Sequence, residues 1–114
     1  MNMNQCGKLR RQRITEADRL VFLSTDSVRK ADAERAREKA FRHRRRAAGL
    51  LEKAACLFRS AGLGHRALQC WDEAATAWIE PGAMAHVRRC EARVIEIAAY
   101  LGDTSGEPHQ GESR

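Results

Sequence analysis

The chain has 114 residues, a formal net charge of +6, 43% hydrophobic residues and 5% aromatic residues. This length suits one domain with a modest core and excludes two. No window approaches the roughly 20 apolar residues that a membrane span needs, so we expect a soluble, cytoplasmic protein. The four cysteines lack the paired spacing of a disulfide framework, which fits a reducing compartment.

The basic character is concentrated in the N-terminal half of the chain. Residues 1–46 carry a net charge of +8 and residues 47–114 a net charge of −2. Residues 1–14 are polar and basic without hydrophobic periodicity, which predicts a disordered basic leader. A short helix over residues 15–23 is predicted to end at the sequence STDS, residues 24–27.

A long helix is predicted over residues 27–61. This segment contains no proline and is dominated by alanine, arginine, glutamate and lysine, all good helix formers. Its apolar stripe is thin before Gly49 and strong after it. The alanine stripe over residues 33–47 finds no partner of matching length in the chain, which leaves a homodimer open.

Two shorter helices follow. Hydrophobic periodicity predicts a helix of about 15 residues between Gly62 and Pro81, and a last helix over about residues 83–101. Residues 102–114 have no apolar content and are predicted to form a disordered tail. Because the connections between the helices are short, consecutive helices must pack antiparallel.

The predicted fold is all-α: an antiparallel helical hairpin stack, similar to a tetratricopeptide (TPR) arrangement, with a long N-terminal helix and two shorter ones. Residues 15–101 are expected to form a single helical domain whose core lies within residues 47–101. The predicted core residues are Leu51, Ala54, Leu57, Phe58, Leu68, Trp71, Ala75, Val87, Val94 and Ile97.

The stretch AACLFRSAGLGHRALQCWDEAATA, residues 54–77, resembles a known family signature. It is similar to the ANR and PerC-like small helical transcriptional regulators of Gram-negative bacteria, and the likeness extends over residues 47–93. Two positions depart from that pattern, because Phe58 stands where the families often have glutamate and Gly64 where they often have an aromatic residue. The matching positions are Ala54, Ala55, Leu57, Gly62, Ala67 and Trp71.

The resemblance implies a non-enzymatic transcriptional regulator that contacts another regulatory protein, either an AraC-type activator or a nucleoid protein. The residues predicted to bind that partner are Leu63, Arg66, Trp71 and Trp78. Tryptophans can anchor an interface, but in so small a protein they also fill the core. Core packing is the favoured interpretation of Trp71, whereas an exposed Trp78 would mark a partner site.

Two other functions remain open. The basic half of the long helix could bind nucleic-acid phosphates through Arg42, Arg44, Arg45 and Arg46. The alternative for these arginines is a solvated helix face on which Glu34 and Glu38 provide ion-pair partners. A TPR-like adaptor or chaperone that holds a peptide helix between its own helices is the third candidate.

No enzyme activity, small-molecule substrate, metal or cofactor is predicted. The chain has no glycine-rich phosphate loop, nucleophile elbow or HExxH motif. His65, Cys70, His86 and Cys90 could in principle supply zinc ligands from two helices, but their spacing lacks the tight pairs typical of such sites. Small cysteines at helix contacts are the better explanation of this pattern.

Overall fold

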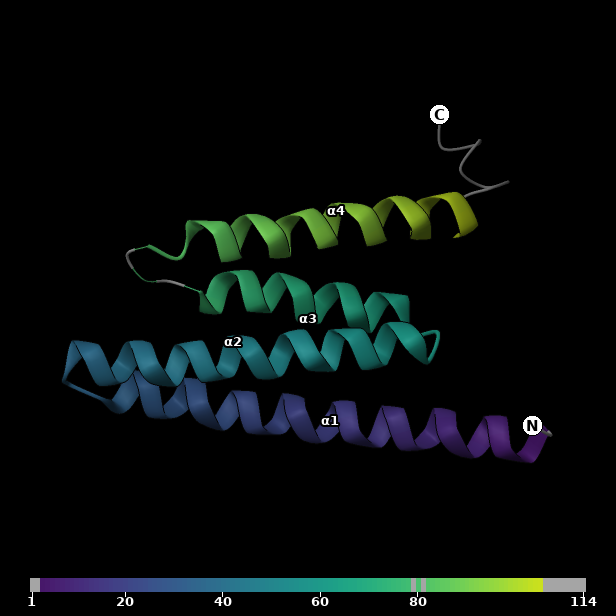
Figure 1. Cartoon of the computed structure of the whole chain (residues 1–114), viewed down its shortest axis with the longest axis horizontal. Helices are drawn as coiled ribbons and strands as arrows, with labels where there is room; N and C mark the ends of the chain where they lie inside the picture. The colour runs from purple at the N-terminus through teal and green to yellow at the C-terminus, as the bar shows by residue number, and fades with distance from the viewer. Residues whose placement is uncertain (1–2, 79, 81, 106–114) are drawn as a thin grey trace.

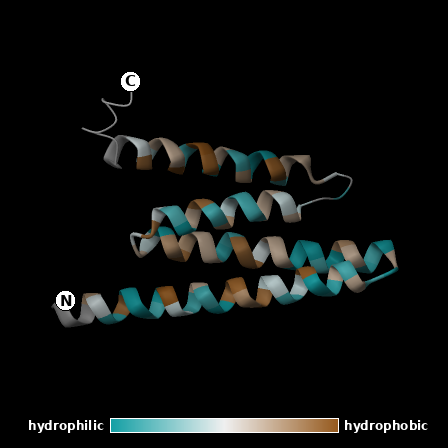
Figure 2. Cartoon of the chain, turned by 180° about the vertical axis from the view of Figure 1, so that it is seen from behind, coloured by the Kyte–Doolittle hydropathy of each residue, from teal (hydrophilic) through white to brown (hydrophobic). Residues whose placement is uncertain are grey.

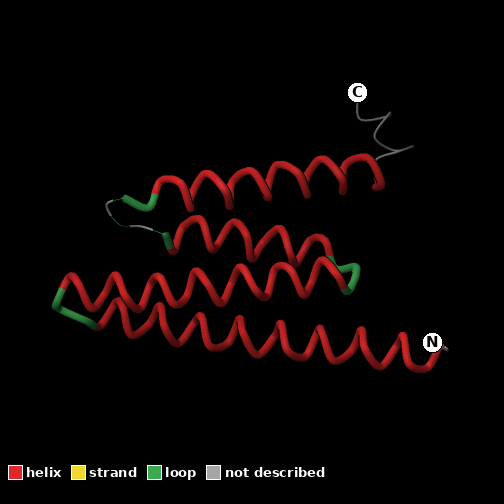
Figure 3. The backbone as a smooth tube through the Cα atoms, in the orientation of Figure 1, coloured by secondary structure: helices red, strands yellow, loops and turns green. Residues whose placement is uncertain are grey.

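The computed structural model describes residues 3–78, 80 and 82–105 as four helices lying side by side in chain order (Figures 1 and 3). They are α1 (Met3–Ala33), α2 (Arg37–Ser60), α3 (Gly64–Ala77) and α4 (Met84–Ser105). Each helix runs antiparallel to its neighbour and packs against it, α1 on α2, α2 on α3 and α3 on α4. The stack is flat, with extents of 51 × 41 × 21 Å. The predicted all-α antiparallel hairpin stack is confirmed.

The predicted long helix is wrong in its boundaries, because the chain reverses direction at residues 34–36. Ala36 has an extended conformation with φ −76° and ψ 119°, and its amide donates to the Glu34 carboxylate at 3.1 Å. The predicted break at STDS is also wrong, since α1 runs straight through it. The hydroxyls of Ser24 and Thr25 donate to the Val21 carbonyl at 2.7 and 3.1 Å, so they are satisfied within the helix.

Small residues form the contact between α1 and α2. The Arg10 guanidinium donates to the Ala61 carbonyl at 2.8 Å and sets the antiparallel register. In that register two stripes of buried small residues lie at the same levels along the two helices, and the members of each stripe are seven residues apart. Small side chains let the backbones of two helices approach closely. The basic half of α2 therefore packs on α1, and the premise that its alanine stripe lacks a partner is wrong. The stripes are Ala17, Ser24 and Ala31 in α1, and Ala40, Ala47 and Ala54 in α2.

Helices extend into both of the predicted disordered ends. Residues 3–14 belong to α1, so the predicted leader is wrong for these residues, and Ile14 packs against the core. The helix α4 continues to Ser105, and residues 106–114 of the predicted tail lie outside the described residues.

The helix α2 ends at a glycine, where the sequence predicts. Gly62 has φ +84°, and the amides of Gly62 and Leu63 donate to the carbonyls of Arg59 and Phe58 at 3.0 and 2.8 Å. This arrangement is a Schellman motif, which satisfies the last carbonyls of α2. Gly82, with φ +86°, lies in the turn before α4. The predicted positions of the two shorter helices are confirmed to within a few residues.

The core lies along the middle of the stack, and hydrophobic positions alternate with hydrophilic ones along every helix (Figure 2). Of the predicted core residues, Leu51, Ala54, Phe58, Trp71 and Ile97 are buried. The others are half-buried, namely Leu57, Leu68, Ala75, Val87 and Val94. Within the described part of the chain, no helix combines the length and apolar character that crossing a membrane requires.

Candidate functional site

Two grooves lie on the stack, each bounded by alternate helices and floored by the helix between them. The α1–α3 groove contains a hollow of about 340 Å³. The α2–α4 groove, floored by α3, contains a hollow of about 350 Å³. The α1–α3 hollow is lined by Ser24, Thr25 and Val28 of α1, Leu51 of α2, and Asp72, Glu73, Thr76 and Ala77 of α3.

The α1–α3 groove joins an apolar floor to an acidic rim. Leu51 and Ala77 are 3% and 8% exposed and form the floor with the half-buried Val28. Asp72 and Glu73 are the only charged residues among those that line the hollow, and both are exposed. Neither carboxylate forms an ion pair with another described residue. The rim is therefore negative in a protein whose net charge is positive.

An ion pair crosses this groove at the end nearest the α2–α3 turn. The Arg66 guanidinium donates to the Asp18 carboxylate at 2.8 Å and lies 4.2 Å from the centroid of the buried Phe58 ring. The groove thus has an apolar floor and an acidic wall whose carboxylates have no ion-pair partner among the described residues.

The α2–α4 groove is bridged by a cluster around Glu52. One carboxylate oxygen, Oε2, accepts hydrogen bonds from Trp78 Nε1 and an Arg89 Nη, both at 2.7 Å, and lies 3.4 Å from the Cys90 thiol. The Trp78 ring stacks on His86 with centroids 4.1 Å apart and an interplanar angle of 12°. One oxygen thus ties α2 to the end of α3 and to α4.

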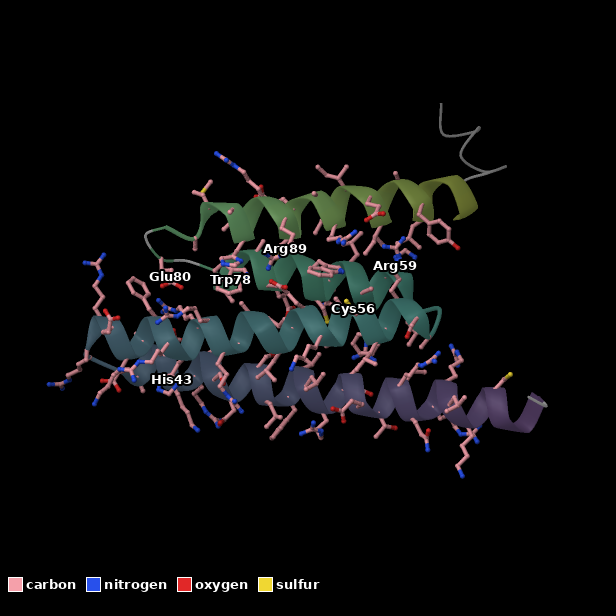
Figure 4. The ribbon with its side chains drawn as sticks, in the orientation of Figure 1. His43, Cys56, Arg59, Trp78, Glu80 and Arg89 are labelled. Carbon is pink, nitrogen blue, oxygen red and sulfur yellow. The ribbon has the colours of Figure 1, made fainter. Side chains whose placement is uncertain are left out.

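A second set of ion pairs closes the other end of the α2–α4 groove. Glu96 of α4 lies 3.6 Å from Arg59 of α2 and 3.1 Å from Arg93 of α4, and the hydrogen bond from Arg93 lowers the Glu96 pKa. Figure 4 shows Trp78, Arg89, Cys56 and Arg59 along the strip between α2 and α4. The hollow between these ties is lined by Cys56, Arg59, Ser60, Trp71 and Arg93.

Burial raises the thiol pKa of one cysteine beside each groove. The pKa of Cys70 rises to about 11, chiefly because the thiol is buried, and the Glu73 charge adds to the effect. The pKa of Cys90 rises to about 12, again chiefly through burial, with the Glu52 charge second. Both thiols are therefore protonated and poor nucleophiles at neutral pH.

The structure does not bring the four predicted partner-binding residues together. Leu63 lies at the α2–α3 turn and packs on the core, while Arg66 faces Asp18 in the α1–α3 groove. Trp71 is 6% exposed and belongs to the core, as the favoured interpretation predicts. Trp78 is half-buried and its indole N–H is bonded to Glu52, so it is a structural residue of the α2–α4 groove.

The four predicted nucleic-acid residues also point in different directions. Arg44 pairs with Asp32 of α1 at 3.1 Å, and Arg45 lies 3.6 Å from Glu80 beyond α3. Only Arg42 and Arg46 remain exposed without a partner among the described residues. They belong to a stripe on the outer side of α2, spaced three, four and seven residues apart, formed by exposed Lys39, Arg42, Arg46 and Lys53.

Sequence reasoning missed the two carboxylate features of these grooves. Asp72 and Glu73 are adjacent acids in an alanine-rich helix, which is a weak signal by itself. Glu52 follows the buried Leu51 directly, so its position beside the core could have been suspected. Among the described residues, no three His, Cys, Asp or Glu side chains are placed to hold a metal ion.

Comparison with known proteins identifies no relative. No protein-family model matches the chain, and no curated protein or solved structure is significantly similar to it. The resemblance to the ANR and PerC-like families therefore stays a prediction that rests on residues 47–93 alone.

Proposed function

We propose that this protein is a non-enzymatic transcriptional regulator that acts by contact with another regulatory protein, which it binds in the α1–α3 groove. The observation that carries the proposal is the apolar floor of this groove beside the unpaired Asp72 and Glu73. The resemblance over residues 47–93 supplies the regulatory role and its partner class, an AraC-type activator or a nucleoid protein.

The chemistry of the groove favours a helical segment that carries one apolar anchor and basic neighbours. Helix-in-groove recognition places an apolar side chain on a buried floor and charged groups at the rim. Here Leu51 and Ala77 provide the floor, and two carboxylates without ion-pair partners provide the complementary charge. The opposite groove offers less, because its carboxylates Glu52 and Glu96 are already bonded to arginines.

A charge-reversal comparison tests the proposal. Tagged protein is used to capture partners from a nuclease-treated lysate, once as wild type and once with Asp72→Lys and Glu73→Lys. We expect the wild type to retain a transcription factor or nucleoid protein that the double variant loses. The matched control reverses the exposed Glu38 and Glu91, which changes the net charge equally but away from the groove. If the groove variant and the control variant retain the same partner equally, the proposal is contradicted. If the wild type captures only proteins unrelated to transcription, the proposal is also contradicted, and an adaptor or chaperone is favoured instead.

A second candidate function is direct nucleic-acid binding, which the exposed stripe of Lys39, Arg42, Arg46 and Lys53 favours. Because each neutralised phosphate releases counterions, affinity for duplex DNA should fall steeply with salt. Replacing Arg42 and Arg46 by alanine should weaken binding and flatten this dependence. The control replaces Arg44 and Arg45, which are held in ion pairs. Absent or salt-insensitive binding removes this candidate.

A further inference from the structure

A shallow cleft lies between α1 and α2, on a side of this helix pair that neither α3 nor α4 reaches. It has a volume of about 640 Å³, and all of the residues that line it belong to α1 and α2. Four leucines form its floor, of which Leu20 is 6% exposed and the other three are half-buried. This α1–α2 cleft is therefore bounded by neighbouring helices, unlike the α1–α3 and α2–α4 grooves. The four leucines are Leu20, Leu23, Leu50 and Leu57.

The residues that line the cleft follow the spacing of a coiled coil on both helices. On α2, four of them are four, three and four residues apart, and on α1 the two leucines are three residues apart. Residues at this spacing form a stripe along a helix against which a further helix can pack. The stripe on α2 is roughly 16 Å long, which accommodates about three turns of such a helix. Its members are Arg46, Leu50, Lys53 and Leu57.

The rim of the cleft carries unpaired positive charge. Arg46 and Lys53 are exposed, and neither forms an ion pair with another described residue. The rim on α1 is neutral, because Arg19 and Glu16 pair with each other at 2.7 Å. The exposed Arg42, one helical turn before Arg46, extends the positive charge along α2. A complementary ligand therefore supplies apolar side chains to the leucines and negative charge to the two cations.

We propose that the α1–α2 cleft binds an acidic amphipathic helix of a partner protein. The apolar side of that helix packs on the leucine floor, and its glutamates or aspartates lie beside Arg46 and Lys53. A flat anionic bilayer does not reach leucines that are half-buried in a concave surface, and nucleic-acid phosphates would give them no apolar contact. The cleft and its charge both differ from those of the α1–α3 groove, so this proposal holds or fails independently of the function proposed for that groove.

The first test selects binders of the whole chain from a displayed library of helical peptides at physiological ionic strength. We expect enriched sequences to carry apolar residues three and four positions apart, flanked by glutamate or aspartate. Reversing both cations, with Arg46→Glu and Lys53→Glu, should weaken the binding of these peptides by roughly tenfold or more. The matched control, Arg35→Glu with Arg88→Glu, changes the net charge equally at exposed positions outside the cleft and should bind like the wild type. If no enriched peptide depends on Arg46 and Lys53, the proposal is overturned.

The second test asks whether the apolar floor takes part. Leu50→Ala shortens the floor without changing the charge, and it should weaken the binding of a selected peptide by roughly tenfold. Circular dichroism checks that the variant stays helical. If the peptide binds this variant as tightly as the wild type, the cations act alone and the proposal is overturned.

The variant with both cations reversed also identifies other occupants of the cleft. The proposal is overturned if this variant loses binding to duplex DNA or to vesicles of anionic lipid while no selected peptide responds to it. It is equally overturned if the wild type sediments as a dimer that the variant dissociates, because the occupant is then a second copy. Peptides that respond only to Asp72→Lys and Glu73→Lys would overturn it too, and would support the function proposed for the α1–α3 groove.

Discussion

The two grooves of this protein are built from similar helices but differ in how their polar groups are used. In the α2–α4 groove, the Glu52 oxygen and Glu96 bind groups from the facing helices, so the acids hold the stack together. In the α1–α3 groove, Asp72 and Glu73 stay unpaired among the described residues, and a single ion pair, Arg66 with Asp18, crosses it. Paired carboxylates stabilise a fold, whereas unpaired ones beside an apolar floor are free to meet a partner.

Removing the Glu52 carboxylate should produce the largest loss of stability. Glu52→Ala leaves Trp78 Nε1 without its acceptor and the Arg89 guanidinium without its partner in a half-buried setting. A lost acceptor of this kind costs about 2 kcal/mol of the free energy of unfolding. Urea denaturation followed by circular dichroism measures it. The matched change in the other groove, Glu73→Ala, should cost less than about 0.5 kcal/mol. Equal losses for the two variants would show that the grooves do not differ.

Alkaline pH should also lower the stability, by an amount that differs between the grooves. Thiol pKa values in the folded protein are raised from an ordinary 9.0 to about 11 for Cys70 and about 12 for Cys90. Because the unfolded chain then releases these protons first, stability is fully present below pH 9 and is lost as pH rises through 11 to 12. Unfolding free energies measured across this range test the effect. Cys90→Ala should remove more of the loss than Cys70→Ala, and an identical loss in both variants would argue against it.

Breaking the single tie across the α1–α3 groove should have the smallest effect. Arg66→Ala removes an exposed ion pair with Asp18 and the contact of its guanidinium with the Phe58 ring. Exposed ion pairs contribute little, so we expect a loss of about 1 kcal/mol or less. Arg66→Lys keeps the charge but loses the planar stacking, and should recover part of the loss. A loss as large as that of Glu52→Ala would mean that this groove, too, depends on its ionic tie.

Local sequence signals account for much of the fold. The end of α2 at Gly62 could be predicted, because helices often end at a residue with positive φ and glycine adopts this conformation without strain. The burial of Leu51, Phe58, Trp71 and Ile97 could be predicted because apolar residues at helical spacing must share one face. The reversal at residues 34–36 could not, since no proline or glycine marks it and its residues are good helix formers.

The candidate site was harder to predict than the fold. Arg66 was singled out and does lie in the α1–α3 groove, but Trp71 and Trp78 are structural residues on the other side of α3. The unpaired state of Asp72 and Glu73 depends on which cations lie within reach across neighbouring helices. That information is absent from a pattern that repeats along one helix.

By itself, then, the sequence determined that the protein is helical, that the helices after residue 36 run antiparallel in turn, and which side of each of these helices is buried. These properties follow from residue spacing and from short connections, both of which act over short distances along the chain. Only the tertiary structure decided where α1 ends and how alternate helices meet across a groove. Those outcomes depend on the register between stripes of small residues far apart in sequence, because close approach of two helices is favourable only where both present small side chains at the same level.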